Sequence, residues 1–335
     1  MDSRRTSRPL NRPTLTLYRV HRPKSGNTAL ESQETQTAQA ADTVTKAGLA
    51  GALILGGGLR APALSQEVGR PILDLPQNEH KSLLDNWFDA FETVGLGHET
   101  TTVLTDSIGE RLWRRVPRSP ALRVDSSEYR GPAGVLRDAS DSIKDDGARL
   151  VIEHTRLLGE AGELRSVYES HLSGDQSITI ATNPDGSFAG ILIADPDAIQ
   201  IIPTIGFMDI KEQWIPAVQA NGFSVRRVPL GCRCEAIRSL DTYLGVLDRL
   251  DAFSEQPFSH VLGRIERGIT QAEYGGSLIM PTAQIGSGVS AARSVICDCA
   301  EIGDGAIVVR SVVGPHARVP KEGVVVDSVV RATDD

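Results

Sequence analysis

The C-terminal part of the chain constrains the fold most, because it repeats a short pattern of aliphatic residues and glycines. From about Ser277 an aliphatic residue followed by small residues returns roughly every six positions, as in "AQIGSGVS" and "AEIGDGAIVV". This rhythm is typical of a left-handed parallel β-helix, whose turns stack apolar side chains inward, and it predicts about three coils. Ordinary β-hairpins are the alternative, which the Ile-Gly-x-Gly units disfavour. The predicted β-helix covers residues 270–332, and the rhythm is carried by Ile285, Val295, Ile302, Val312 and Val319.

Residues 49–262 alternate short apolar runs with amphipathic segments, which predicts an α/β domain with a mostly parallel, Rossmann-like sheet. The first predicted strand is the run Ala52–Leu55, bounded by glycine. Helical spacing with terminal glycines or caps predicts helices over Ser82–Gly97, over Phe207–Gly222 with Asp209 as its cap and Glu212 at the capping-box position, and over Leu240–Phe253. Further strands are predicted in "TTVLTDS", "ARLVIEH", "QSITIAT", "AGILIAD" and "SVRRVPL".

Composition excludes several classes of protein. The net charge of -8 argues against a nucleic-acid binder, because no sustained basic surface could follow a phosphate backbone. No apolar run is long enough to span a membrane. The cysteines form two close pairs, Cys232/Cys234 and Cys297/Cys299, which indicates reduced thiols and a cytoplasmic location. A zinc site is the alternative, but the spacing is Cys-x-Cys and no histidine is near.

The first 48 residues differ from the rest. They contain arginines and then a Ser/Thr/Gln/Ala segment, with no apolar stretch of the secretory type. The composition predicts a disordered basic and polar tail and linker, because it offers too little apolar surface to order itself. A polyanion-binding arm is the alternative interpretation.

A glycine-rich loop follows the first predicted strand. Gly56, Gly57 and Gly58 are followed by Arg60, and a second arginine, Arg70, precedes a proline. Ligands of such sheets bind beyond the carboxyl ends of the strands, where this loop lies. Backbone N–H groups in a glycine loop can cradle phosphates, and arginine adds positive charge.

Together, these segments resemble the sugar-1-phosphate nucleotidylyltransferases, also called NDP-sugar pyrophosphorylases, of the mannose-1-phosphate guanylyltransferase type. "GGGLRAPAL" and "GRPILDLP" stand where that family has Gly-Gly-x-Gly-Thr-Arg-Leu and Pro-Lys-Pro, and the loop here is one residue shorter, with Leu59 in place of threonine. "YRGPAGVLRDA", "AGILIADPDAIQIIP", "FMDIKEQWIPAVQANGFSVRRVPL" and "SLDTYLGVLDRL" resemble later family segments in the same order, so the resemblance covers residues 49–330.

The resemblance implies a role for specific residues. The glycines Gly56, Gly57 and Gly58 with Arg60 would bind the nucleotide phosphates, and Arg60 and Arg70 would stabilise charge in an active enzyme. The segment that approaches the nucleobase would contribute Gly131, Ala133 and Gly134.

The chemistry of this family also needs a metal. An oxygen of a sugar 1-phosphate attacks the α-phosphorus of a nucleoside triphosphate and pyrophosphate leaves, so magnesium and cationic side chains must neutralise the charge. The two family positions for metal-binding aspartates are occupied here by His154 and Ala236, and imidazole is a poor magnesium ligand. Glu153 and Glu235 are the fallback candidates. The family's Glu-Lys-Pro hairpin, which carries sugar contacts, is replaced by the short "NPDGSF".

Three functions remain open from the sequence. The first is a family member with a degenerate metal site, which binds a nucleotide or NDP-sugar or regulates an active nucleotidyltransferase partner. The second is an active transferase with a rebuilt metal site, to which Asp106 or Asp138 could contribute and for which Mg²⁺ would be the cofactor. The third is an oligomerisation scaffold, because a short β-helix exposes open edges that proteins usually cover. An acyltransferase-like role for His316 is a weaker alternative than a surface histidine.

Overall fold

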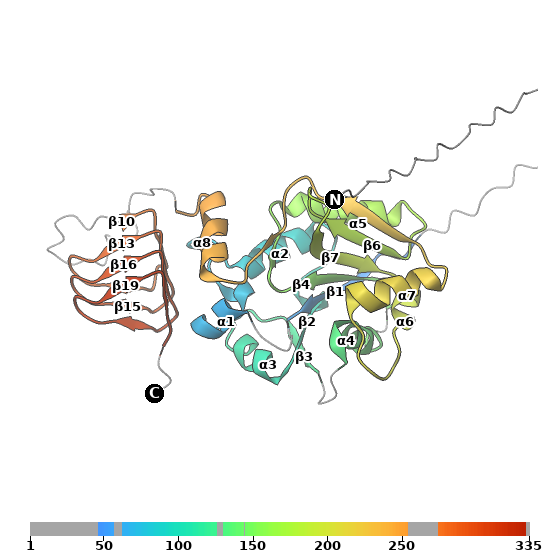
Figure 1. The fold of residues 1–335 in the computed structure, drawn as a ribbon, viewed down its shortest axis with the longest axis horizontal. Coiled ribbons are helices and arrows are strands. Elements are labelled where there is room, and N and C mark those ends of the chain that lie inside the picture. The colour runs from blue at the N-terminus through green and yellow to red at the C-terminus, as the bar shows by residue number, and fades with distance from the viewer. Residues whose placement is uncertain (1–45, 57–61, 126–129, 144, 254–273, 333–335) are drawn as a thin grey trace, which may run out of the picture. The chain divides into compact units, whose positions relative to one another are not determined.

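The computed structural model describes residues 46–56, 62–125, 130–143, 145–253 and 274–332. A seven-stranded sheet forms its α/β part (Figure 1). Its strands, in spatial order, are β3 (Ala121–Val124), β2 (Thr101–Thr105), β1 (Leu49–Leu55), β4 (Ala148–Glu153), β7 (Phe188–Ala194), β6 (Ile178–Thr182) and β8 (Val225–Pro229). The predicted segment 1–48 lies outside the described residues except for its last three positions.

The order of the strands reverses beside β1. The chain places β2 and β3 on one side of β1 and then crosses to put β4 on the other, with all four strands parallel. β7 is antiparallel to both of its neighbours, whereas β8 is parallel to β6. The crevice at the carboxyl ends of β1 and β4 is therefore the topological switch point, where open α/β sheets bind their ligands.

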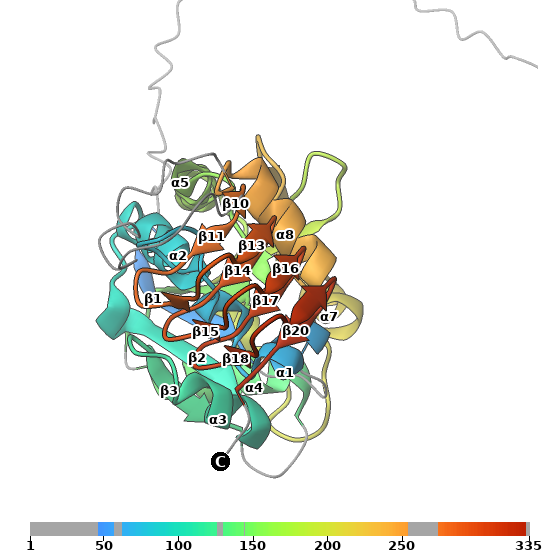
Figure 2. The same ribbon diagram turned by 90° about the vertical axis from the view of Figure 1, so that its left-hand side faces the viewer.

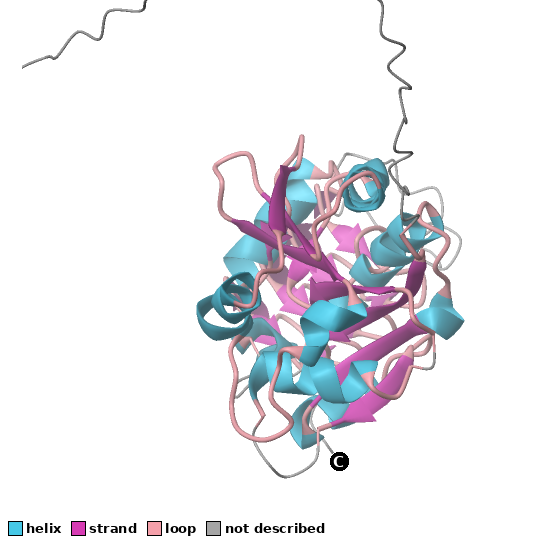
Figure 3. Ribbon diagram, turned by 90° about the vertical axis from the view of Figure 1, so that its right-hand side faces the viewer, coloured by secondary structure: helices cyan, strands magenta, loops and turns pink. Residues whose placement is uncertain are grey.

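Alternation along the strands builds two separate apolar cores on the two faces of the sheet. Ala52 and Ile54 of β1 face one core, whereas Leu53 faces the other. The first core is covered by α1 (Ala63–Val68), α2 (Leu83–Glu92), α3 (Ser107–Trp113), α5 (Ala161–Leu172) and α8 (Leu240–Arg249). The second is covered by α4 (Gly131–Ser140), α6 (Pro196–Gln200), the π-helical turn Ile210–Trp214 and α7 (Ile215–Ala220). Figure 3 shows the strands lying between these helices.

The helix ends follow the capping residues that the sequence supplies. Ser82 caps α2 with a full capping box to Asp85. Asp209 accepts bonds from the backbone N–H groups of Lys211 and Glu212, so the predicted cap is confirmed. The residue that reaches back to the Asp209 N–H is Gln213 rather than Glu212, at 2.7 Å. The single helix predicted over 207–222 is wrong in detail, because a π-helical turn precedes α7, where Pro216 lacks an N–H donor.

The C-terminal segment forms stacked parallel strands. Leu278 pairs with Val295 and Val295 with Val312, and hydrogen bonds recur at a separation of 17 residues. Figure 2 shows the strands of successive coils in columns. The first column is β10 (Tyr274–Gly275), β13 (Ser290–Ala292), β16 (Ile307–Val309) and β19 (Val324–Val326). The second is β11 (Leu278–Ile279), β14 (Val295–Ile296), β17 (Val312–Val313) and β20 (Val329–Val330), and the third is β12 (Gln284–Ile285), β15 (Glu301–Ile302) and β18 (Arg318–Val319).

The parallel, β-helix-like tail is thus confirmed, and two of its columns extend one strand beyond the coils predicted. One expectation about it is wrong. Val295 and Val312 point out of the coil into the first core of the α/β part, while their neighbours Ile296 and Val313 fill the coil. Both residues of each such strand are aliphatic, so the sequence offered no contrast from which to choose the inward one.

Two further features of the described residues concern membrane-spanning helices and disulfide bonds. No helix in the described part of the chain is long and apolar enough to cross a membrane. All four cysteines are free thiols.

Candidate functional site

The switch point holds a small pocket at the carboxyl ends of β1 and β4. Its volume is about 110 Å³, well below the ~300–1,000 Å³ of a complete small-molecule site, so the described residues enclose only part of a nucleotide-sized ligand. Residues 57–61 and 126–129 lie outside the described residues. The pocket is lined by Leu55, Pro132, Val151, Ile152, Glu153, Phe188, Gly190, Leu192, Asp209, Ile210 and Lys211.

Glu153 is the central charged group of this pocket. Its carboxylate accepts a hydrogen bond from Arg156 Nε at 2.9 Å and lies 3.3 Å from Lys211 Nζ. Burial alone would raise the pKa of Glu153, but Lys211 and Arg156 outweigh it and the pKa is lowered. Glu153 is therefore an ionised carboxylate between two cations.

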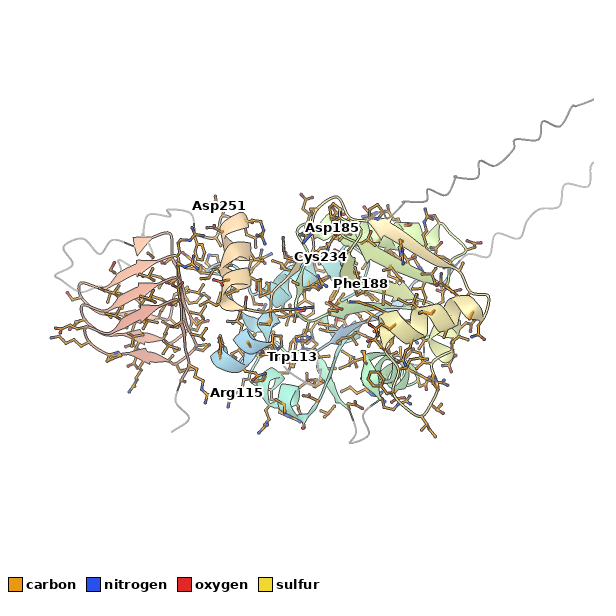
Figure 4. All side chains as sticks on the ribbon, viewed as in Figure 1. Trp113, Arg115, Asp185, Phe188, Cys234 and Asp251 are labelled. Carbon is orange, nitrogen blue, oxygen red and sulfur yellow. The ribbon has the colours of Figure 1, made fainter. Side chains whose placement is uncertain are left out.

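The two cations reach Glu153 from different parts of the chain. Lys211 belongs to the π-helical turn, and its ammonium lies 4.3 Å from the centre of the Phe188 ring at the start of β7 (Figure 4). Arg156 passes over Gly190, where a Cβ atom would lie 2.5 Å from Arg156 Cγ, so a glycine is required there. With Asp209 included, these four charges balance, and the described pocket is not electropositive by itself.

His154 joins the ends of β1 and β4. Its Nδ1 lies 2.6 Å from the carbonyl oxygen of Leu55, and its backbone N–H donates to the same oxygen at 3.2 Å. A carbonyl only accepts, so Nδ1 carries the proton. Burial lowers the pKa of His154, partly offset by the Leu55 bond. His154 is thus a neutral histidine that is hydrogen-bonded at the ends of β1 and β4.

The fold brings His154 and Ala236, which the resemblance places at the two metal positions, close together. β5 (Arg156–Leu157) and β9 (Glu235–Ala236) form a small antiparallel pair in which Ala236 lies opposite Arg156. Arg156 follows His154 by two residues. Glu235 alternates to the other side and pairs with Arg249 of α8 at 3.1 Å. The fallback pair of Glu153 and Glu235 is therefore split between different partners.

The other candidate carboxylates are also committed. Asp106 caps α3 by accepting the backbone N–H groups of Ile108 and Gly109. Asp138 receives two hydrogen bonds from the buried Arg130, at 2.9 and 3.0 Å. Within the described ranges, no three His, Cys, Asp or Glu side chains gather in a way that could hold a metal ion. Burial also raises the pKa of Cys234 to about 12, which disfavours the thiolate that zinc requires.

The glycine loop lies mostly outside the described residues, including Gly57, Gly58 and Arg60. Gly56 directly follows β1, and its N–H donates to Leu104 O at 2.8 Å, so this donor is not free for a phosphate.

The segment predicted to approach the nucleobase forms the start of α4. Gly131 has φ 73° and no room for a Cβ atom, which would lie 2.7 Å from Met208 O. The N–H of Ala133 donates to the same oxygen at 3.1 Å, and Gly134 packs against Arg130. Their neighbour Pro132, which the sequence analysis did not single out, is the residue of this segment that lines the pocket.

Arg70 is held in an ion pair away from the pocket lining. Its guanidinium lies 2.9 Å from Asp74 and donates to Arg115 O at 2.5 Å. Burial raises the pKa of Asp74 to about 6, although Arg70 lowers it.

The pKa of Asp74 predicts a specific pH dependence. The folded state holds this proton more tightly than the unfolded state, whose value is near 3.8, so the contribution to stability is complete below pH 3.8 and lost as pH rises to about 6. We expect the unfolding free energy of the wild type, relative to Asp74→Asn, to fall by about 2–3 kcal/mol across this window. Urea unfolding of both proteins between these pH values measures it, and parallel profiles would contradict it.

His316 and the aromatic residues of α2 occupy ordinary positions. His316 is exposed at a corner of the coils with φ 60°. Trp87 is fully buried and donates to Arg156 O at 2.8 Å, which fixes the backbone beside the pocket. Phe88 packs at the edge of the first core.

Comparisons with known proteins add little to this geometry. No protein-family model matches the sequence, and no curated protein matches it. Among solved structures, Rv0371c from Mycobacterium tuberculosis H37Rv is similar at 15% identity with a TM-score of 0.45, over 61% of this chain and 99% of that one. A similarity at this level carries no argument about function.

Proposed function

We propose that this chain is a nucleotidyltransferase-family protein of sugar-nucleotide metabolism that binds a nucleotide or NDP-sugar without magnesium-dependent turnover. It would act as a binding or regulatory subunit in the cytoplasm, alone or beside an active nucleotidyltransferase. The observation that carries the proposal is that the switch-point crevice lies where the glycine loop begins, while the two positions for metal aspartates hold His154 and Ala236. A Rossmann-like nucleotidyltransferase domain followed by a left-handed β-helix is the fold that goes with it.

The donor set does not fit magnesium. This ion prefers several carboxylate or water oxygens in octahedral geometry. Ala236 offers no oxygen, His154 offers a nitrogen, and the Glu153 carboxylate is already bound to Arg156 and Lys211. Removing Glu153 from these cations would leave them without their partner inside a half-buried pocket.

Ligand binding has separate support. Pro132, Phe188 and Ile210 supply an apolar wall suited to part of a base or sugar, and Lys211 supplies a half-exposed ammonium at the rim. Because the described charges balance, we propose that Arg60 and N–H groups of the loop after Gly56 would add to Lys211 the positive charge that phosphates need.

Two alternatives each have one favourable observation. The active transferase is favoured by Glu153, an ionised carboxylate at the carboxyl end of β4. Glu153 stands one residue before the position at which the family has a metal-binding aspartate. The oligomerisation scaffold is favoured by the coils, which expose the aliphatic side chains of Ile307, Val324 and Val326.

A thermal-shift panel of nucleotides and NDP-sugars, with and without magnesium, combined with a pyrophosphate-release assay, separates the three functions. A ligand that binds only the native state raises its melting temperature. We expect at least one ligand to stabilise the protein equally with and without magnesium and no pyrophosphate to be released. Release of pyrophosphate from a nucleoside triphosphate in the presence of a sugar 1-phosphate would identify an active transferase. If no ligand of the panel shifts the melting temperature, the oligomerisation scaffold is the remaining function.

A further inference from the structure

The small antiparallel pair of β5 and β9 continues the switch-point crevice past the end of β4. In this pair, Arg156 lies opposite Ala236. The backbone N–H of Ile237 donates at 2.7 Å to the carbonyl oxygen of the residue before Arg156, which continues the same register by one step. One further step sets Arg238 opposite His154, the residue that directly follows β4.

Alternation along this segment places Arg238 on the side of the pocket. Ile237 is fully buried in the first core, so Ala236 and Arg238 on either side of it face away from that core. The side chain of Arg156 lies on this side too, where it binds Glu153 of the pocket lining at 2.9 Å. Ala236 adds only a methyl group between the two arginines.

The charge of Arg238 reaches the end of β4. Burial is the main cause of the lowered pKa of His154, and the positive charge of Arg238 lowers it further, against the opposing effects of Leu55, Glu153 and Asp106. The guanidinium therefore lies near the imidazole, because charges in water are largely screened beyond a Debye length of about 10 Å.

The other charged groups around this point are already paired, whereas Arg238 is not. Lys211 and Arg156 share Glu153, and Asp106 accepts two backbone N–H groups of α3. The backbone N–H of Arg238 donates to the first turn of α8, but its exposed side chain makes no hydrogen bond or ion pair with the described residues. A guanidinium carries five N–H donors in a planar fork that matches the oxygens of a phosphate.

We propose that Arg238 binds a phosphate group of the ligand at the end of the crevice beyond His154. This inference rests on the proposed function, because it names a residue that holds the phosphates of the nucleotide or NDP-sugar. An ammonium has three N–H donors, so Lys211 can bind Glu153 and still meet a second phosphate at the rim of the pocket. Cations at these two positions suit a ligand with two linked phosphate groups.

Isothermal titration of the full chain with inorganic pyrophosphate, in the presence of EDTA, tests the role of Arg238. We expect Arg238→Ala to weaken pyrophosphate binding about tenfold to a hundredfold, because a charge-assisted contact is lost. Arg238→Lys keeps the charge but not the planar fork, and it should recover only part of the affinity.

Arg227→Ala is the matched control. Arg227 is an exposed arginine of β8, which is the third strand from β4 in the sheet, and its side chain also has no partner among the described residues. This variant should bind pyrophosphate like the wild type. Both arginines are exposed, so both variants should retain the wild-type circular dichroism.

The outcomes separate this inference from the proposed function. Equal pyrophosphate affinity of Arg238→Ala and Arg227→Ala would overturn the role of Arg238, as would a wild type that does not bind pyrophosphate. Nucleotide or NDP-sugar binding that Arg238→Ala leaves unchanged would overturn it too, while the proposed function would stand. Pyrophosphate binding that depends on Arg238, in a protein that binds no nucleotide or NDP-sugar, would support the phosphate site and overturn the proposed function.

Discussion

Replacing Val312 with aspartate is expected to lower the free energy of unfolding by about 3–5 kcal/mol, the cost of an uncompensated charge in a core. Val312 is 0% exposed and belongs to the core that the coils share with the α/β part. Around it, α1 packs against β20, and Arg293 and Arg310 of the coils bind Asp248 and Asp241 of α8. The substitution should therefore loosen the α/β part as well as the coils.

Val324→Asp is the matched control for this prediction, because it makes the same change on the same coils at a position that is 66% exposed. At a protein concentration too low for association, its unfolding free energy should stay within about 0.5 kcal/mol of the wild type. Chemical denaturation followed by tryptophan fluorescence reports on the α/β part, where Trp87, Trp113 and Trp214 are buried. If Val312→Asp unfolds like the wild type, the coils do not share a core with the α/β part.

Replacing Lys211 with alanine is expected to weaken nucleotide binding by tenfold to a hundredfold, which corresponds to about 1.5–3 kcal/mol for the loss of a charge-assisted contact. Lys211 supplies the half-exposed cation at the rim of the switch-point pocket, and its removal leaves Glu153 and Asp209 there with Arg156 alone. The pocket then becomes net negative and repels phosphate.

Lys81→Ala provides a control with closely similar solvent exposure. The Lys81 side chain is 47% exposed, compared with 49% for Lys211, and it also forms an ion pair, with Asp89 at 2.6 Å, but it does not line the pocket. Isothermal titration should give wild-type affinity for this variant. Equal affinity of Lys211→Ala and Lys81→Ala would remove Lys211 from the site.

The sequence predicted the position of the site better than its content. The glycine loop after an apolar strand indicated a ligand site at the carboxyl end of that strand, and β1 does border the switch point. The resemblance placed His154 and Ala236 at the two metal positions, and the pairing of β5 with β9 sets Ala236 opposite Arg156, two residues after His154. Local patterns of this kind are readable because strand ends and helix caps depend on neighbouring residues.

The charged partners of Glu153 were not predicted. Lys211 lies 58 positions further along the chain, and only the packing of the π-helical turn beside β4 brings it to 3.3 Å. No spacing in the sequence signals such a contact. The outward orientation of Val295 and Val312 was missed for a related reason, since both residues of their strands are aliphatic and tertiary contacts alone decide which one enters the coil.

The effect of a metal chelator on nucleotide binding tests the central claim most directly. Isothermal titration of the wild type and of Arg60→Ala, with the best ligand of the thermal-shift panel, should be run in magnesium and again in EDTA. We expect EDTA to leave the wild-type affinity unchanged, because His154 and Ala236 provide no carboxylate pair for the ion, and Arg60→Ala to weaken binding about tenfold to a hundredfold in both buffers. Loss of wild-type binding in EDTA would contradict the account and would make Glu153 and Glu235 the first residues to test as metal ligands.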